Sequence, residues 1–322
     1  MTLFHSLRVA SLCALIATNA AAAAEHHTLK RSDGSSIDWY LDRQHPSDHQ
    51  GILVIAQGSG CGSVENNRNV DVAKGLRPDF AVLTVEKYGV EPGAIQKGPD
   101  DCSSTFWAKH TISQRVRDYR TVLSALKTER WWNGQLVLFG GSEGGAVVQI
   151  LAADVNANAT VIFSSATGIP FRDAFVQTLP AGMAVEAKAQ LDKALRNPLS
   201  TARWGGNSYR WWADIADRPL WQDALKASGV LLVVQGARDK SNPVSSARAF
   251  RDAFAARTNL TYWEYEDYDH AMVDSAGTSH LTQVFLRISN WLIRLDMSDK
   301  ASKAGAMPND RSASKSTSLF AR

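Results

Sequence analysis

The stretch QLVLFGGSEGGAVVQILAAD, residues 135–154, decides the fold of this chain. It opens with a short apolar run (135–139), passes through the pattern G-x-S-x-G at Gly140, Ser142 and Gly144, and continues into a helical run. A sharp turn from strand to helix lifts a serine above a sheet, and small flanking residues let that turn close. The helix N-terminus also offers free N–H groups to a developing anion. The stretch predicts Ser142 as a nucleophile, and the alternative is a Gly-rich turn without chemistry.

The rest of the chain alternates short β-rich runs with helical stretches. The middle runs are continuously apolar, which is typical of strands that are covered on both faces. Apolar residues at a spacing of three and four predict helices over 112–129, 245–257 and 278–295. The alternation predicts an α/β fold, with a mostly parallel sheet flanked by helices. The predicted strands cover residues 35–42, 51–56, 80–85, 135–139, 160–164, 230–235 and 260–266.

One long interval interrupts this alternation. The segment 170–229 lies between two predicted strands and is too long for an ordinary crossover. Its pattern is mostly helical, and it would lie above the carboxyl edge of the sheet, where such folds bind ligands. We therefore expect a helical cap insertion over about 170–229. It carries four tryptophans, which either contact a ligand or only pack the insertion onto the body: Trp204, Trp211, Trp212 and Trp221.

A serine at its ordinary pKa is a weak nucleophile, and it needs a base that is oriented by an acid. When a serine stands on a strand-to-helix turn, the chain order is serine, acid, histidine. Asp239 follows the strand predicted at 230–235, and His270 follows the strand predicted at 260–266. The sequence therefore predicts Asp239 and His270 as the partners of Ser142.

Other side chains fit these roles less well. Asp267 and Asp269 are too close to His270 in sequence to orient its ring easily. His110 precedes the nucleophile strand, which breaks the expected order, and His280 falls at the start of the last predicted helix.

An acyl-transfer site also needs two N–H groups that bind the oxyanion. One is expected from Glu143, the residue after the nucleophile, and the other from the loop that follows strand 51–56. That loop reads QGSGCG (57–62), and its glycines allow a close backbone approach. We predict the backbone N–H of Ser59 as the second donor, with Gly60 as the near alternative. Tyr88, after the strand at 80–85, either adds a hydroxyl there or only packs.

With these residues in place, the chain resembles the α/β-hydrolase superfamily over residues 28–296. The resemblance rests on QGSG (57–60), GGSEGG (140–145), GARD (236–239) with Pro243, and the pair Asp269-His270. The last regions look similar to the dienelactone-hydrolase and prolyl-oligopeptidase-like branches, but the length leaves no room for a propeller. The resemblance implies acyl transfer to water through a serine acyl-enzyme, with no metal and no cofactor. The family's usual His-Gly in the oxyanion loop is replaced here by Gln57-Gly58.

Composition excludes several other classes of protein. The 322 residues include 35 basic and 32 acidic ones, and 44% are hydrophobic. This composition is typical of a globular protein. The excess of positive charge lies at the two ends. The body is therefore nearly neutral, and its charge does not indicate nucleic-acid binding. The expected partner is a small-molecule acyl substrate. The oligomeric state stays open.

The two ends are expected to lie outside the fold. Residues 1–24 have the layout of a signal peptide, with Arg8, an apolar stretch and several A-x-A frames. Residues 297–322 are rich in Ser, Ala and Lys and are expected to be a disordered tail, which leaves 25–296 as the hydrolase domain. No later segment is apolar enough to span a bilayer. We expect export, to the periplasm or outside the cell.

Export changes how the cysteines are interpreted. Cys13 would leave with the signal peptide, so Cys61 and Cys102 remain in the mature chain. An oxidising compartment favours a disulfide between them, and the alternative is two free thiols.

These observations together predict an exported serine hydrolase that cleaves a carboxylic ester through Ser142, His270 and Asp239. A serine peptidase or amidase would use the same three residues, and a non-catalytic binding protein of the same fold is the alternative from another class. The sequence contains no H-E-x-x-H or similar cluster that would predict a metallohydrolase.

Overall fold

The computed structural model describes residues 24–43, 49–98 and 100–305. The main strands are β1 (Glu25–Lys30), β2 (Ser36–Asp42), β3 (Gln50–Ala56), β4 (Ala81–Val85), β5 (Trp132–Gly141), β6 (Ala159–Phe163), β9 (Val230–Gly236) and β10 (Leu260–Tyr265). The helices are α1 (Arg68–Lys74), α2 (Ser104–Lys109), α3 (Ile112–Leu126), α4 (Glu143–Asp154), α5 (Phe171–Gln177), α6 (Ala184–Arg196), α7 (Tyr209–Ile215), α8 (Leu220–Ala224), α9 (Val244–Ala253) and α10 (Leu281–Gly305). A small second sheet pairs β7 (Arg203–Trp204) with β8 (Asn207–Ser208), and 3₁₀ turns lie at Val64–Asn66 and Ala181–Met183.

The eight main strands form one sheet in the order β1-β2-β4-β3-β5-β6-β9-β10. The strands from β4 to β10 run parallel, and β2 pairs antiparallel with both β1 and β4. The mostly parallel α/β sheet predicted from the sequence is confirmed. Strand β1 was not predicted, because its residues EHHTLK are polar and mostly exposed on this antiparallel edge.

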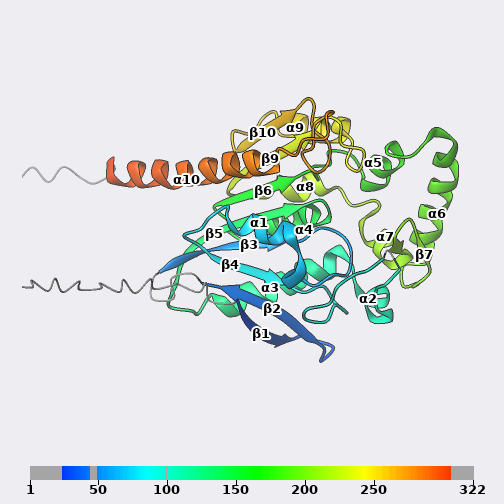
Figure 1. Ribbon diagram of the computed structural model, residues 1–322, viewed down its shortest axis with the longest axis horizontal. Coiled ribbons are helices and arrows are strands. Elements are labelled where there is room, and N and C mark those ends of the chain that lie inside the picture. The colour runs from blue at the N-terminus through cyan, green and yellow to red at the C-terminus, as the bar shows by residue number, and fades with distance from the viewer. Residues whose placement is uncertain (1–23, 44–48, 99, 306–322) are drawn as a thin grey trace, which may run out of the picture.

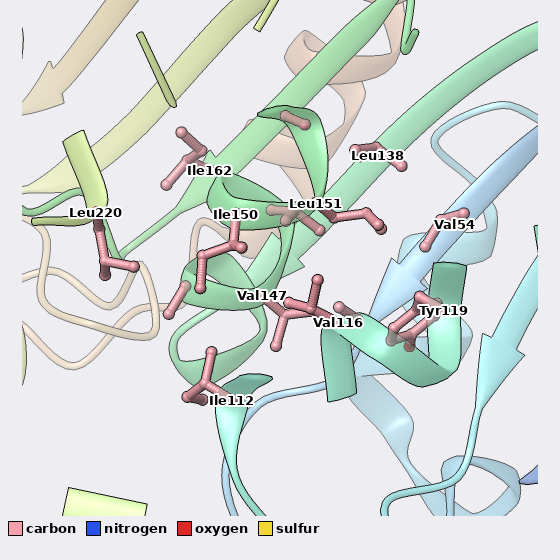
Figure 2. Close-up of a cluster of buried hydrophobic side chains, with 14 of the residues drawn as sticks. Val54, Ile112, Val116, Tyr119, Leu138, Val147, Ile150, Leu151, Ile162 and Leu220 are labelled. Atoms are coloured by element: carbon pink, nitrogen blue, oxygen red, sulfur yellow. The ribbon is translucent and has the colours of Figure 1, made fainter. Parts of the chain in front are cut away.

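Successive residues of the central strands enter two separate cores, because side chains alternate across a sheet. In β3, Ile52 and Val54 join the core under α3, α4 and α8, while Leu53 and Ile55 join the core under α1 and α10. Every residue of β3, β4 and β6 is buried, which explains the continuous apolar runs in the sequence. Figure 2 shows the first core, where side chains of α3 and α4 point toward those of β3, β5 and β6.

Helix α4 is the centre of that first core. It packs on β3, β5 and β6, and also contacts α3 and α8. Its residues from Glu143 to Ala152 are all buried, so the helix is apolar all round rather than amphipathic. The helix that follows Ser142 is therefore fixed on several sides, and this holds the strand-to-helix turn in place.

The predicted insertion is helical and lies beyond the carboxyl ends of the strands. Helices α5, α6 and α7 and the β7–β8 hairpin project there, on the right of Figure 1, whereas α8 returns to the body against α4. Its aromatic side chains contact one another: Trp212 lies within 4.7–5.6 Å, centroid to centroid, of Phe175, Trp204 and Trp211. The aromatic side chains of the insertion are therefore continuous with the first core.

The last helix differs from its prediction at both ends. It begins at Leu281 rather than 278, because Ser279 still pairs with Val273 in an isolated β-bridge. It continues past 296 to Gly305, into the segment expected to be a tail. The remainder of that segment, 306–322, and residues 1–23 of the expected signal peptide lie outside the described residues. Within the described part, no helix is long and apolar enough to cross a membrane.

Candidate active site

Ser142 stands on the turn between β5 and α4 with φ of 52° and ψ of −125°, a left-handed conformation that costs energy for any residue other than glycine. The turn is tight: a methyl group on Gly144 would lie 1.9 Å from the carbonyl oxygen of Ala56, and one on Gly140 would lie 2.1 Å from that of Gly144. The backbone N–H of Ser142 donates to the carbonyl of Phe163 at 3.0 Å. The glycines of the motif are thus required for the close contact of strand and helix.

His270 and Asp239 meet at the carboxyl ends of β10 and β9. The Nδ1 atom of His270 lies 2.8 Å from Oδ2 of Asp239. The Asp239 side chain is fully buried, and that of His270 is 31% exposed. The hydroxyl of Ser164 donates to the backbone carbonyl of His270 at 3.0 Å. The carboxylate therefore contacts one ring nitrogen, and Ser142 and His270 line the same two cavities.

The two competing acids are engaged elsewhere in the same loop. Asp269 Oδ1 accepts the backbone N–H groups of Ala271 and Val273, both at 2.9 Å. Asp267 accepts from Ser275 and lies 3.4 Å from Arg238. Both carboxylates shape the loop that carries His270, and Asp239 is the one that contacts its ring.

Neutral groups hold Asp239 in place. Its Oδ1 accepts the backbone N–H groups of Ser241 and Asn242, at 2.7 and 2.8 Å. Its Oδ2 accepts from the amide of Gln235 at 3.1 Å, in addition to His270. Gln235 and Asn242 are buried and bond to each other at 2.9 Å. Besides the histidine, three neutral donors therefore hold this carboxylate: two backbone N–H groups and one side-chain amide.

The loop after β3 passes beside Ser142. A methyl group on Gly58 would be 3.6 Å from Cβ of Ser142, and Ser59 lines the same cavity as Ser142 and Glu143. Cys61, within this loop, forms a disulfide with Cys102, with Cα atoms 5.6 Å apart. The backbone N–H of Cys61 donates to Oε1 of Gln96 at 2.8 Å. Tyr88 does not reach this loop with its hydroxyl, which donates to Asp33 instead.

Beneath the loop lies a cluster of buried charged side chains that the sequence did not predict: Lys87, His110, Arg115 and the side chain of Glu143. Arg115 Nη1 donates to Glu143 Oε1 at 2.7 Å, and His110 Nε2 lies 3.2 Å from the same oxygen. Lys87 donates to the carbonyls of Gly58 and Gly60, each at 2.5 Å. Each residue comes from a different element, so no local motif could have indicated the cluster.

In this cluster, burial and the neighbouring charges shift the pKa values in opposite directions. Burial lowers the pKa of Lys87 to about 7, although Glu143 and Glu86 counteract it. Burial also lowers the pKa of His110. Burial alone would raise the pKa of Glu143, but the adjacent His110, together with Lys87 and Arg115, outweighs it, so that pKa lies below its usual range. Glu143 is therefore an ionised carboxylate beside Ser142.

Two cavities of unequal size meet at Ser142 and His270. The larger, of about 520 Å³, opens toward the insertion and is lined there by aromatic side chains: Phe171, Phe175, Trp211 and Trp212. The smaller, of about 140 Å³, lies on the α10 side and is lined by Phe139, Phe163, Leu281 and Phe285. The smaller cavity is mainly apolar, whereas the larger one also has polar lining residues, among them Asn207, Lys240 and Ser241. Among the described residues, no group of three or more His, Cys, Asp or Glu side chains is placed to hold a metal ion.

Comparisons with known proteins address the fold. No protein-family model matches the chain, and no curated protein matches it in sequence. Among solved structures, an esterase from Butyrivibrio proteoclasticus is 15% identical with a TM-score of 0.57, over 86% of this chain and 100% of that one. An esterase from Pyrococcus furiosus is 12% identical with a TM-score of 0.58, over 85% of this chain and 91% of that one.

A peptidase shares the same architecture. Dipeptidyl peptidase 4 from Porphyromonas gingivalis is 15% identical with a TM-score of 0.57, over 84% of this chain but only 35% of its own length. The described part of our chain contains the sheet and its helices with an insertion, and no propeller. The strand order, the turn at Ser142 and these likenesses agree, and the chain has the α/β-hydrolase fold.

Proposed function

We propose that this protein is an exported serine hydrolase that cleaves carboxylic esters through a covalent acyl-enzyme. One observation carries the proposal: the ring of His270 contacts the buried carboxylate of Asp239 at 2.8 Å and shares its cavities with the strained Ser142. A strained serine beside an oriented histidine is the arrangement that nucleophilic acyl transfer needs.

The mechanism follows from the chemistry of these groups. Ser142 Oγ attacks the ester carbonyl while Nε2 of His270 takes its proton, and Asp239 keeps the other ring nitrogen protonated. The charge that develops on the carbonyl oxygen is stabilised by the backbone N–H groups of Ser59 and Glu143. His270 then protonates the leaving alcohol. A water molecule, deprotonated by His270, attacks the acyl-enzyme and releases the acid.

The shape of the cavities supports an ester with two unequal halves. An aromatic-lined space of about 520 Å³ fits a bulky apolar or aromatic group, because such side chains bury apolar ligands well. The space of about 140 Å³ between phenylalanines fits a short aliphatic group. An ester with one small and one bulky substituent fills both, whereas two bulky substituents do not.

Export is part of the proposal. The N-terminal stretch has the layout of a signal peptide. The disulfide between Cys61 and Cys102 is of the kind that persists in oxidising compartments. Fractionation of cells that express the full chain, followed by N-terminal sequencing of the product, tests this part. An intact N-terminus in the cytoplasmic fraction would contradict it.

The central experiment uses a fluorophosphonate probe, which labels activated serines. The proposal expects labelling of the wild type, loss of labelling in Ser142→Ala, and full labelling in the exposed control Ser228→Ala. Labelling of a folded Ser142→Ala protein contradicts the assignment. A panel of p-nitrophenyl esters of graded chain length beside aminoacyl anilides then separates an esterase from a peptidase or amidase. No labelling and no turnover would favour a non-catalytic binding protein.

A further inference from the structure

The loop at Gln57–Gly60 is held from behind by two buried cations. Lys87 Nζ donates to the carbonyl oxygens of Gly58 and Gly60, each at 2.5 Å. Arg115 Nη2 donates to the carbonyl oxygen of Gln57 at 2.7 Å. Lys87 is 1% exposed and Arg115 is 3% exposed, so water does not compete for these bonds. Three carbonyl groups of one short loop are therefore directed inward.

The geometry of the peptide bond decides what this does to the N–H groups. A trans peptide is planar, and its C=O and N–H point in opposite directions. The loop shows this at the next position: the carbonyl of Gly60 accepts from Lys87, while the N–H of Cys61 in the same peptide unit donates to Gln96 on the other side. By the same rule, the bond from Lys87 to the Gly58 carbonyl turns the N–H of Ser59 away from Lys87.

The second oxyanion donor is connected to the same cations. Arg115 bridges the two segments, because one guanidinium nitrogen holds the Gln57 carbonyl and the other holds Glu143 Oε1 at 2.7 Å. Glu143 is the residue whose backbone N–H follows Ser142. Ser59, Ser142 and Glu143 line one cavity. The buried cations thus act on both predicted donors at once.

We propose that Lys87 and Arg115 are positioning residues, which fix the peptide units of the oxyanion loop so that the N–H of Ser59 is aimed at the carbonyl oxygen of the substrate. The inference rests on the proposed function. Lys87 has a second effect, because its positive charge aligns with the dipole of the Gly58–Ser59 peptide and strengthens the N–H as a donor. Oxyanion stabilisation of this kind depends on donors that are fixed before the reaction begins.

The charged and titratable groups around Lys87 determine how this effect varies with pH. They are Glu86 beside it in the chain, Glu143 on α4, Arg115 on α3, and His110 between α2 and α3. Burial brings the pKa of Lys87 to about 7. The neutral amine still donates hydrogen bonds but has lost its charge. We therefore expect kcat to decline as pH rises through about 7 toward 9, without a matching change in KM.

The test compares Lys87→Met with Lys127→Met, an exposed lysine at the end of α3. Methionine has a similar length but cannot hold the carbonyls. Removal of one oxyanion donor typically costs about 10²–10³ in kcat, so loss of its positioning should cost about 10–100-fold on p-nitrophenyl acetate. We expect KM to stay within about twofold, fluorophosphonate labelling to persist at a lower rate, and the alkaline decline of kcat to disappear. Lys127→Met should match the wild type.

Two results would overturn the inference. One is a folded Lys87→Met protein whose kcat is within twofold of the wild type. The other needs no variant: a kcat for the wild type that does not fall between pH 7 and 9. The second result overturns the contribution of the Lys87 charge. If Lys87→Met does not fold, Arg115→Lys decides the positioning, because lysine keeps a charge beside Glu143 but cannot also hold the Gln57 carbonyl. A folded Arg115→Lys protein with a kcat within twofold of the wild type overturns the inference. A failure of the proposed function would look different, since the wild type itself would then neither label with the probe nor turn over esters.

Discussion

The residues on the two sides of Ser142 are held in place by different kinds of group, neutral donors on one side and cations on the other. On the His270 side, the buried Asp239 is held by two backbone N–H groups and the amide of Gln235, all of them neutral. On the oxyanion side, the loop and Glu143 are held by the cations Lys87 and Arg115. Among the described residues, Asp239 is the buried charge beside the histidine on the first side, whereas the second side has a buried cluster of charged side chains.

This difference has a physical reason. In the proposed mechanism the acid stabilises a histidine that becomes positive during the reaction, and a cation placed on Asp239 would weaken that effect. In the same mechanism the loop at Gln57–Gly60 binds a negative charge, so cations behind its carbonyls would reinforce its N–H donors. The ionic cluster carries a cost, because buried charges depend on each other for compensation. We therefore expect changes on the first side to affect catalysis and changes on the second to affect stability as well.

The largest effect is expected from Asp239→Asn. An amide cannot hold the histidine tautomer that accepts the serine proton, and an equivalent change in a serine hydrolase lowers kcat by about 10⁴-fold. The unfolding midpoint in urea should fall by less than in Arg115→Met, because asparagine keeps the volume and leaves no unpaired buried charge, although its amide cannot accept from Gln235 and His270 as Oδ2 does. The matched control is Asp267→Asn, the exposed carboxylate of the His270 loop. Steady-state kinetics should show less than a threefold loss in this control, and equal losses in both variants would refute the assignment.

On the oxyanion side, Arg115→Met should be the most damaging to stability. It leaves Glu143 ionised and buried with only His110 within 3.2 Å, and Oε2 of Glu143 already lacks a hydrogen-bond partner among the described residues. Removing one partner of a buried ion pair costs about 3–5 kcal/mol. Arg117→Met, on the exposed face of the same helix, serves as the control. Urea unfolding measures both, and a loss below 1 kcal/mol in Arg115→Met would mean that the cluster is not energetically coupled.

The same contrast separates what was predictable from what was not. Ser142, Asp239 and His270 each follow a strand in a fixed chain order, so their positions could be inferred from apolar runs and the turn glycines. The geometry places these three together, while their roles remain predictions. The sheet was predictable because strands buried on both faces leave continuous apolar runs, whereas the exposed strand β1 leaves no such pattern.

The sequence did not predict the ionic cluster, and the reason is different. Lys87, Arg115 and His110 are of types usually found on surfaces, and their burial depends on contacts between distant segments. His110 was set aside because it precedes the nucleophile strand, and that rule concerns only the catalytic base. Sequence periodicity reports which face of an element is apolar, and it does not report a charged residue that finds its partner across the core.

A smaller effect is expected in the pH dependence of stability. The pKa of Lys87 is about 7 in the folded protein, below its ordinary 10.5, so the unfolded chain binds more protons between these values. Stability therefore rises with pH in this window, by at most about 1.4 kcal/mol per pH unit for one proton. Urea unfolding at pH 7, 8 and 9 should show a steeper rise in the wild type than in Lys87→Met. Parallel slopes would mean that Lys87 is charged throughout this range.

The smallest effect is expected from Gln235→Met on the neutral side. The amide of Gln235 donates to Oδ2 of Asp239, the oxygen that also contacts His270, and two backbone N–H groups remain on Oδ1 after the change. A hydrogen bond to a charged group contributes about 1.5–3 kcal/mol, and the remaining donors should reduce the loss in kcat to about fivefold. The comparison with Lys87→Met is informative, because each variant removes one amine or amide donor from one side of the serine. If Gln235→Met lowers kcat more than Lys87→Met, then orientation of the acid, and not of the oxyanion loop, limits the reaction.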